Sequence, residues 1–483
     1  MKAAGSAFGA LAALTVALLA WRFWVVPQLG IALYVDEAQY WTWAQHLDWG
    51  YFSKPPGVAA LIATSTGLFG DGILGVKALA MVCYPAAAWV VRAIALRLYD
   101  ERTANWSATA VLTLPMFSWL GLFVSTDALL TLFWVLALLA YLRVLESDAW
   151  SDWLLLGTLC GLGLMSKYTM IAWMLAACLH LAAFHRTRLA SPRPWVAALL
   201  ALAILAPNIL WNMANDWPTL KHTADITVNK KAGGGFKALG EFIAAQWIAF
   251  GPVLGSVFVV LLVNARSTWR DERLRLLLWF SLPLWAVVCG QAWRSSANAN
   301  WAAPAFAPAA IAVVAWLLQR ERRRLLTAGL AINLLLVGIV YHWPQLLRAA
   351  NVKEASRKDP FTRARGWDEL GRQLQPLVAA HPGAVVIADN RTLLAHMTYE
   401  LRGLNPPTAA WNPRGEHSDH YKLTTDLGPY VGRDALLVTR DALPAEMAAR
   451  FAGSEKLARL AAPLDERNAL TMDVYLLHGF KGY

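Results

Sequence analysis

Long apolar stretches recur through the first 340 or so residues of this 483-residue chain. A run of about 20 apolar residues is long enough to cross a bilayer as a helix. The composition agrees, because 57% of the residues are hydrophobic and only 16% are charged, whereas about 25% of residues in soluble domains are charged. We predict a polytopic α-helical membrane domain with eleven spans, at residues 6–27, 73–96, 104–122, 127–145, 152–166, 169–185, 194–212, 241–263, 274–292, 301–319 and 325–342.

Two apolar stretches need separate comment. The first span is expected to be retained, and a cleaved signal peptide is the alternative. The stretch 57–69 is too short to cross a bilayer and is predicted to lie at the membrane interface. The four cysteines all fall in apolar runs, where packing accounts for them, and their spacing suggests no metal site.

The basic residues predict the orientation. Eleven spans put the termini on opposite sides, and arginines gather in one set of loops, at positions 97, 102, 143, 186, 188, 193, 266, 270, 273, 275, 320, 322, 323 and 324. The positive-inside rule makes that side cytoplasmic. The net charge of +11 therefore favours anionic lipid head groups over nucleic acid as partners, since the basic residues form no single stripe.

The tail is more polar and follows a different pattern. We predict a division between a transmembrane domain at 1–344 and a soluble periplasmic α/β domain at 345–483. A helix is expected at 367–380, with strands at 384–388, 435–439 and 472–477. The tail contains neither a Gly-rich phosphate loop nor a nucleophile elbow, so it is expected to support or gate a site.

An acidic pair, Asp36-Glu37, follows the first span among aromatic residues. Carboxylates beside a membrane are costly to place and are read first as functional. Neighbouring residues on a helix or strand point in different directions, so we predict that Asp36 reacts and Glu37 supports it. The alternative is a solvated or helix-capping pair. Tyr40 and Tyr51 are predicted to line the substrate cavity.

The segment Tyr51-Phe-Ser-Lys54-Pro-Pro56 comes next. Two prolines stiffen the backbone and fix the direction of the lysine. We predict that Lys54 is a positioned cation for a phosphate. The alternative is a lysine that extends to the membrane interface.

Two further motifs fall on the same predicted side. Asp127 opens the fourth span, where it is predicted to be a second carboxylate of the cavity, and helix capping by Asp127 or Thr126 is the alternative. Lys167-Tyr168 occupies a very short hairpin and is predicted to grip the same phosphate. Its alternative is an interfacial anchor.

The remaining candidates lie in two outer loops. Arg294 suits bidentate phosphate binding, and Asn300-Trp301 follows it, although a plain loop is the alternative. Loop 213–240 is long and Gly-rich, which is typical of a mobile flap. It holds His222, a predicted cavity residue, with Lys230 and Lys231. A divalent metal is left open, with His46 and His222 as candidate ligands, and no other cofactor is predicted.

The stretches Asp36-Glu-Ala-Gln-Tyr40-Trp and Gly50-Tyr-Phe-Ser-Lys54-Pro-Pro resemble the polytopic GT-C glycosyltransferases. The likeness is to the bacterial branch of the protein-mannosyltransferase-like family, which includes lipid A aminoarabinose and galacturonosyl transferases. Ser125-Thr-Asp127, Ser166-Lys-Tyr168 and Asn300-Trp-Ala-Ala-Pro304 also match. The resemblance covers most of the membrane domain.

This resemblance implies an inverting glycosyltransferase of the bacterial inner membrane that uses a polyprenyl-phosphate-linked sugar donor. It also implies that the carboxylate of Asp36 is catalytic and that Lys54 lies in the active cavity. The predicted acceptor is lipid A, lipopolysaccharide or another cell-envelope glycan on the periplasmic side. Protein O-glycosylation is an alternative reaction, and a lipid-linked sugar flippase or transporter is the alternative class.

Overall fold

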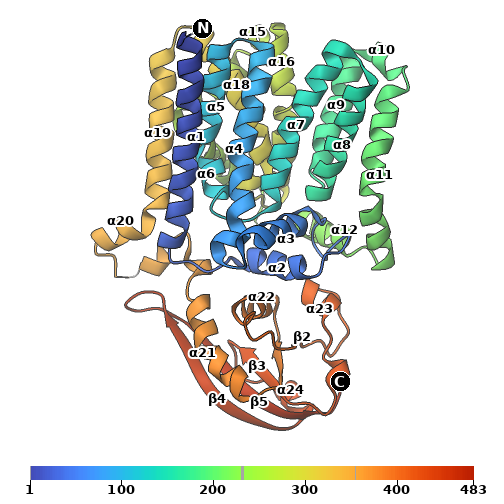
Figure 1. Cartoon of the computed structure of the whole chain (residues 1–483), viewed down its shortest axis with the longest axis vertical. Helices are drawn as coiled ribbons and strands as arrows, with labels where there is room; N and C mark the ends of the chain where they lie inside the picture. Colours follow the sequence, from blue (N-terminus) through green and yellow to red (C-terminus); the bar gives the residue numbers. More distant parts are fainter. Residues whose placement is uncertain (1, 230–232, 354) are drawn as a thin grey trace. The chain divides into compact units, whose positions relative to one another are not determined.

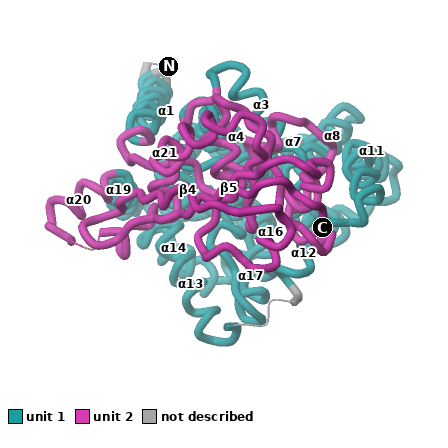
Figure 2. Tube along the Cα trace, turned by 90° about the horizontal axis from the view of Figure 1, so that it is seen from below, with its two compact units in different colours: residues 1–25, 54–70, 74–341 teal, residues 26–53, 71–73, 342–483 magenta. Residues whose placement is uncertain are grey.

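The computed structural model describes residues 2–229, 233–353 and 355–483. The chain forms two compact units. Unit 1 comprises residues 1–25, 54–70 and 74–341, and unit 2 comprises 26–53, 71–73 and 342–483 (Figure 2). The acidic segment after the first helix is thus grouped with the tail. The domain division at residue 345 stays a prediction.

Unit 1 is built from helices, and its long helices run side by side in Figure 1. Their bounds are α1 Lys2–Gln28, which continues into unit 2, α3 Gly57–Phe69, α4 Ile73–Leu98, α5 Glu101–Thr113, α6 Pro115–Leu120, α7 Thr126–Ser147, α8 Trp150–Ser166, α9 Met170–Phe184, α10 Arg186–Leu189, α11 Arg193–Ala214, α12 Pro218–Ala224, η1 Asp225–Asn229, α13 Phe236–Phe250, α14 Pro252–Val263, α15 Ala265–Arg270, α16 Glu272–Trp279, α17 Leu282–Arg294, η2 Ala299–Ala305, α18 Phe306–Gln319 and α19 Arg323–Tyr341.

The protein is a multi-pass membrane protein. Among the described residues, seven helices are long and apolar enough to cross a membrane, or eight if one bent pair counts as a span. That pair is α13 and α14, bent by 115° at Gly251-Pro252. Gly251 has a φ of 89°, and proline lacks the N–H that would continue the helix. Eight of the eleven predicted spans fall on these helices, if the bent pair is counted. The other three, at 104–122, 152–166 and 169–185, fall on shorter helices, and 104–122 is interrupted at Leu114. The number of spans stays a prediction.

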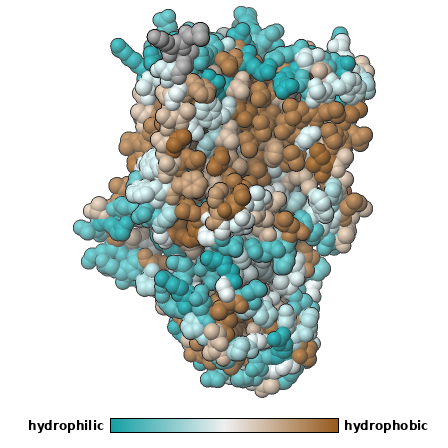
Figure 3. All heavy atoms as spheres, in the orientation of Figure 1, coloured by the Kyte–Doolittle hydropathy of each residue, from teal (hydrophilic) through white to brown (hydrophobic). Residues whose placement is uncertain are grey.

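The outer surface of unit 1 matches a lipid environment. Apolar side chains form a broad band over its helices, and hydrophilic side chains cover the rim above them (Figure 3). Exposed leucines and valines, such as Leu175, Leu199 and Val263, lie on these helices. The predicted interfacial segment 57–69 is the 13-residue helix α3. Its length is about 20 Å, shorter than the hydrocarbon core.

Unit 2 contains a five-stranded sheet of order β2-β1-β3-β5-β4. Strand β1 pairs in parallel with β2 and β3, whereas β5 pairs antiparallel with β3 and β4. The bounds are β1 Val385–Ala388, β2 Thr408–Ala410, β3 Ala435–Thr439, β4 Phe451–Pro463 and β5 Ala469–Phe480. Strands β1 and β3 are buried throughout, as continuous apolar parallel strands are expected to be.

Unit 2 also contains the helices α2 Val35–Gln45, α20 Trp343–Ala349, η3 Ala355–Arg357, η4 Thr362–Ala364, α21 Trp367–Ala380, α22 Arg391–Glu400, α23 His420–Thr424, η5 Gly428–Tyr430 and α24 Ala445–Ala449. Helices α21 to α24 pack against the sheet, whereas α2 carries the acidic segment and packs against α22. The predicted helix at 367–380 and strands at 384–388 and 435–439 are present, and 472–477 lies within β5. The predicted fold class, a helical membrane domain with a C-terminal α/β domain, is confirmed.

Helices α21 and α22 pack closely and bury titratable groups. A Cβ on Gly371 would lie 2.4 Å from Cβ of Glu400. Burial raises the pKa of Glu400 to about 7, against the opposing effect of Arg402. The His396 ring stacks on Trp367 with centroids 3.9 Å apart, and burial lowers its pKa to about 3. Unit 2 therefore holds an acid and a base whose burial shifts both pKa values toward the neutral form.

Candidate active site

The predicted site residues fall in both units. Asp36, Glu37, Tyr40 and Tyr51 belong to unit 2, and Lys54, Asp127, Lys167, Tyr168, His222, Arg294, Asn300 and Trp301 belong to unit 1. Each set is described within its own unit.

The two acidic residues of helix α2 differ in their surroundings. Glu37 is 1% exposed, and its Oε2 accepts a hydrogen bond of 2.8 Å from the backbone N–H of Tyr34, which caps the helix. The Asp36 side chain is 55% exposed and forms an ion pair with Arg391. Asp36 is therefore available to a reactant, whereas Glu37 holds the helix start. The catalytic role of each stays a prediction.

Arg391 was not identified from the sequence. It is the first residue of α22, whose N-cap Asn390 accepts a hydrogen bond of 3.1 Å from Leu393 N–H. This cap fixes the helix start and so the position from which the guanidinium reaches Asp36. No local pattern could reveal the pair, since 355 residues separate its members.

The other side of α2 is packed with aromatic rings. Trp43 and Tyr51 stack with centroids 4.5 Å apart, and Tyr40 lies 4.9 Å from Trp43. The Tyr51 hydroxyl donates to the backbone oxygen of Trp43 at 3.1 Å, and burial raises its pKa to about 12. His420 contacts this stack edge-on, and burial lowers its pKa to about 3. Tyr40 and Tyr51 are 5% and 3% exposed, so within unit 2 they shape the fold around Asp36.

In unit 1 the structure joins three predicted residues. The Asp127 side chain is 2% exposed, and its Oδ1 pairs with Lys167 Nζ at 2.6 Å. Its Oδ2 accepts a hydrogen bond of 2.7 Å from Asn300 Nδ2. The cap of α7 is Ser125, whose Oγ accepts from Asp127 N–H at 3.3 Å, so capping by Asp127 or Thr126 was wrong. Both Asp127 oxygens are thus occupied in holding a cation and an amide.

The Lys54 segment packs beside this cluster. A Cβ on Gly57 would lie 2.8 Å from the backbone oxygen of Met165 and 2.9 Å from Cα of Ser166. Only glycine permits this approach without a shift. The Lys-Pro-Pro-Gly turn is therefore fixed against the residue that precedes Lys167. Two lysines predicted to bind phosphate lie on adjoining segments.

Two buried cations in unit 1 also escaped the sequence analysis. Lys77 is fully buried on α4 and donates to the backbone oxygen of Leu122 at 3.0 Å. Arg22 is 4% exposed and donates to Tyr341 Oη at 2.9 Å and to the Met81 oxygen at 3.1 Å. That oxygen lacks its helical partner because residue 85 is proline. A charge inside a predicted span was the available signal.

Arg22 and Lys77 brace the turn that leads to Asp127. A Cβ on Gly121 would lie 2.5 Å from the Arg22 guanidinium carbon. The Lys77 ammonium lies 5.1 Å from the centre of the Phe123 ring. Both cations therefore contact residues 121–123, just before the Ser125 cap.

The other predicted residues are more scattered. Tyr168 donates to Asn208 Oδ1 and accepts from Asn212 Nδ2, which ties it to α11. Arg294 is exposed at the end of α17, and Trp301 is half-buried in η2. His222 lies on α12, so the predicted flap is partly helical. Lys230 and Lys231 lie outside the described residues.

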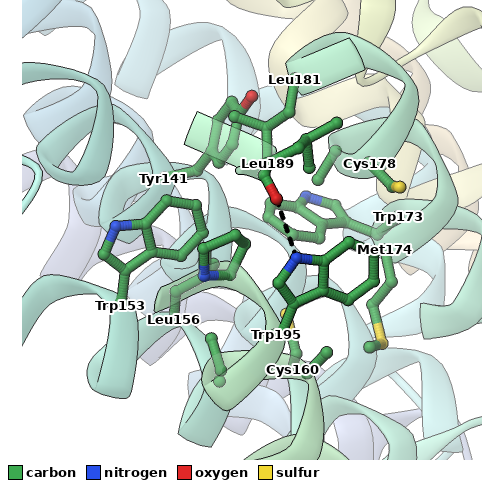
Figure 4. Close-up of a pocket in the computed structure, with 15 residues that line it drawn as sticks. Tyr141, Trp153, Leu156, Cys160, Trp173, Met174, Cys178, Leu181, Leu189 and Trp195 are labelled. Carbon is green, nitrogen blue, oxygen red and sulfur yellow. Dashed lines mark hydrogen bonds between the residues drawn. The ribbon is translucent and has the colours of Figure 1, made fainter. Parts of the chain in front are cut away.

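An apolar cavity of about 110 Å³ lies among α7, α8, α9 and α11 (Figure 4). Tyr141, Trp153, Trp173 and Trp195 line it, and Trp195 donates to the Leu189 oxygen at 2.9 Å. Its described lining residues include none with a charge. Tyr141 is 14 residues along α7 from Asp127, which is roughly 21 Å. The cavity is thus remote from the Asp127 cluster.

Metal ligation was left open by the sequence. Among the described residues, no group of three or more His, Cys, Asp or Glu side chains is placed to hold a metal ion. His46 and His222, the two candidate ligands, belong to different units.

Comparison with known proteins decides the family. The family described as dolichyl-phosphate-mannose-protein mannosyltransferase matches residues 53–211. The lipid A galacturonosyltransferase RgtD of Rhizobium johnstonii is 31% identical over 432 residues, covering 87% of this chain and 89% of that protein. The chain belongs to the protein-mannosyltransferase-like GT-C glycosyltransferases. The predicted family is therefore confirmed.

Further relatives of this GT-C glycosyltransferase agree. An undecaprenyl phosphate-alpha-4-amino-4-deoxy-L-arabinose arabinosyl transferase of Pectobacterium atrosepticum is 26% identical over 347 residues, covering 66% of this chain and 56% of that protein. The crystal structure of ArnT from Cupriavidus metallidurans bound to undecaprenyl phosphate superposes with a TM-score of 0.69. It covers 97% of this chain and 98% of that chain, at 15% identity. The fold is shared along nearly all of the chain. The relatives are named glycosyltransferases, so the predicted enzyme class is confirmed.

Proposed function

We propose that this glycosyltransferase moves a sugar from a polyprenyl-phosphate donor to lipid A or another part of lipopolysaccharide. The strongest support is the identity of 31% along most of the chain with a lipid A galacturonosyltransferase. We further propose galacturonic acid as the sugar, on the same ground. Protein O-glycosylation and lipid-linked sugar transport are the alternatives that the test below separates.

The observation that carries the mechanism is the exposure of Asp36 on an otherwise buried stretch of α2. Residues 37–41 are buried, whereas the Asp36 side chain is 55% exposed and held by Arg391. In the proposed step an acceptor hydroxyl oxygen attacks the anomeric carbon. The bond from that carbon to the phosphate oxygen breaks, and polyprenyl phosphate leaves. Asp36 takes the hydroxyl proton, and the configuration inverts.

The leaving phosphate requires cations, and the predicted basic residues are the ones that we propose. Lys54 and Lys167 lie on adjoining segments fixed by Gly57, and Arg294 is an exposed third candidate. Preorganised cations stabilise charge that develops on a leaving group. Since Asp127 is occupied by Lys167 and Asn300, we propose that it positions these two side chains. Tyr168, anchored by Asn208 and Asn212, would act beside Lys167.

We propose the bacterial inner membrane as the location, with the Asp36 face periplasmic. The support is the gathering of arginines in the loops assigned to the cytoplasm. Single cysteines introduced at position 48 or 222 are expected to react with a membrane-impermeant reagent added from the periplasm. Labelling of these positions only from the cytoplasm would reverse the orientation.

A reconstitution experiment tests the proposed reaction. Purified protein is incubated with undecaprenyl-phosphate-linked galacturonic acid and lipid A, and products are read by mass spectrometry. Asp36→Asn is expected to lower the rate by roughly 10²–10⁴, while Asp48→Asn, another exposed acid of the same segment, retains it. A product on added peptides, or movement of donor without product, would support an alternative. Turnover of Asp36→Asn within about threefold of wild type would remove Asp36 from the step.

A further inference from the structure

A second cavity of unit 1 is lined by arginines. Its volume is about 1200 Å³, and it lies among α14, α18 and α19. The turn between α18 and α19 contributes Arg320, Glu321 and Arg322, and the start of α19 contributes Arg323 and Arg324. Val257, Val260, Trp316, Leu325 and Thr327 complete the lining. Four arginines against one glutamate leave a formal charge of +3. Helix α19 begins at the upper rim of unit 1 in Figure 1, and that rim is hydrophilic in Figure 3.

These arginines are not neutralised by the part of the chain that the structure describes. No described carboxylate lies within 4.0 Å of their guanidinium nitrogens. Elsewhere in unit 1, by contrast, Arg97 pairs with Glu146, Arg143 with Asp152 and Arg193 with Asp148. Two of the four contact aromatic faces, since Arg320 lies 4.1 Å from the Trp316 ring centre and Arg323 lies 5.6 Å from that of Trp106. The cavity therefore keeps an uncompensated positive charge.

The position of the charge adds to this imbalance. Arg323 and Arg324 open the 19-residue helix α19, and Arg322 immediately precedes it. The start of a helix carries a partial positive charge, so cations placed there are unfavourable and anions favourable. An anion in the cavity would be attracted by the arginines and by the helix start together.

The other part of the lining is apolar and continuous with the outer surface. Val260 and Leu325 are each 42% exposed, and Val263, one turn further along α14, is 78% exposed. These side chains belong to helices with the exposed apolar surface that faces lipid in unit 1. A ligand that fits both parts needs an anionic head and an aliphatic chain.

We propose that this cavity binds an anionic membrane phospholipid, with its phosphate on Arg320 and Arg322 to Arg324 and an acyl chain along Val260 and Leu325. Arginine binds phosphate oxygens bidentately. Basic pockets between membrane helices on the cytoplasmic side are established head-group sites. The cavity is distinct from the Asp127 cluster, because its lining includes neither Asp127 nor its partners Lys167 and Asn300, nor any other residue of α7.

The test uses the full chain, delipidated in detergent, and native mass spectrometry with added lipid. Phosphatidylglycerol and phosphatidylcholine with identical chains are compared, and inorganic phosphate is added as a competitor. Each basic residue near a membrane surface contributes about fivefold to binding of anionic lipid. The wild type is therefore expected to prefer phosphatidylglycerol at least tenfold. The triple variant R322Q/R323Q/R324Q is expected to lose that preference.

Two further variants make the result decisive. R102Q/R266Q/R270Q removes three exposed arginines from helices α5 and α15, outside the cavity lining, and is expected to bind like wild type. R322K/R323K/R324K keeps the positive charge that orients the protein during insertion into the membrane. It is expected to bind phosphatidylglycerol more weakly than wild type, since lysine cannot bind a phosphate bidentately as arginine does. Unchanged binding by the glutamine triple variant, or equal binding of both lipids, would overturn the proposal. Displacement of lipid by millimolar inorganic phosphate would make it a free-anion site and overturn it as well.

Discussion

We predict that removing Lys167 destabilises the protein more than removing the charge of Asp127, its partner in a buried ion pair. Asp127 is 2% exposed and Lys167 is 16% exposed, and their charged atoms lie 2.6 Å apart. Removing one partner of a buried ion pair costs about 3–5 kcal/mol, because the other charge is left uncompensated. Lys167→Met leaves the more buried charge, that of Asp127, without its counterion. Asp127→Asn leaves Lys167 an amide oxygen as hydrogen-bond acceptor and some contact with solvent.

We therefore expect Lys167→Met to cost about 3–5 kcal/mol of unfolding free energy and Asp127→Asn about 1.5–3 kcal/mol. The double variant D127N/K167M removes both charges, so that neither is left without a counterion. Its cost is expected to fall below the sum of the single costs by at least about 1.5 kcal/mol.

Unfolding by SDS in mixed micelles, followed by tryptophan fluorescence, measures these three values. Lys221→Met, whose partner Asp216 is 79% exposed, serves as the control and should change stability by less than about 1 kcal/mol. Additivity of the two single variants within about 0.5 kcal/mol would refute the coupling. So would a larger cost for Asp127→Asn than for Lys167→Met.

Three other predictions follow from the site. Gly57→Ala should lower transfer at least tenfold through displacement of the Lys54 turn, whereas Gly67→Ala, with nothing within 4 Å of its added carbon, should stay near wild type; equal rates would discount the packing at Gly57. Arg391→Gln should slow transfer at least tenfold but change stability by less than about 1 kcal/mol, because both partners are partly exposed, and Arg391→Lys should restore part of the rate. The pKa of Glu400 is about 7 in the folded protein and lower in the unfolded chain, so the free energy of unfolding should fall as pH rises from about 4.5 to 7. Glu400→Gln should reduce this loss, measured by SDS unfolding at pH 5 and pH 8, by up to about 3 kcal/mol. An unchanged loss would contradict the burial of the acid.

The sequence predicted those helices and strands whose apolar residues recur with a clear helical or strand pattern. The apolar runs, the amphipathic helix at 367–380 and the buried strands β1 and β3 all carry their own periodicity. Strand β4 was missed because Ser454-Glu-Lys-Leu-Ala-Arg-Leu460 favours a helix by composition, and antiparallel pairing with β5 overrides it. The bend between α13 and α14 had a signal in Gly251-Pro252 that hydropathy alone ignores.

The site was predictable as a set of residues and less so as a set of contacts. Asp127, Lys167 and Asn300 could be named from their motifs, but their mutual bonds span 40 and 173 positions. Arg391 lies in no motif, and only tertiary packing brings it to Asp36. The role of Glu37 as a cap depends on the backbone at Tyr34, which the pair Asp36-Glu37 alone does not reveal.

The grouping of the acidic helix with the tail has a consequence for biosynthesis. During synthesis Asp36 is made long before its partner Arg391. Thr42 is made 379 residues before Tyr421, and their hydroxyl oxygens lie 3.1 Å apart in the folded protein. At about 5–20 residues per second, a ribosome needs roughly 20–75 s to add that stretch. Through this interval a nascent chain already carries its first membrane helix but lacks the residues that hold Asp36 and Thr42. If Asp36 is the catalytic residue, the enzyme should gain activity only after residues 342–483 of unit 2 have been made, and prematurely terminated chains should be inactive in the membrane.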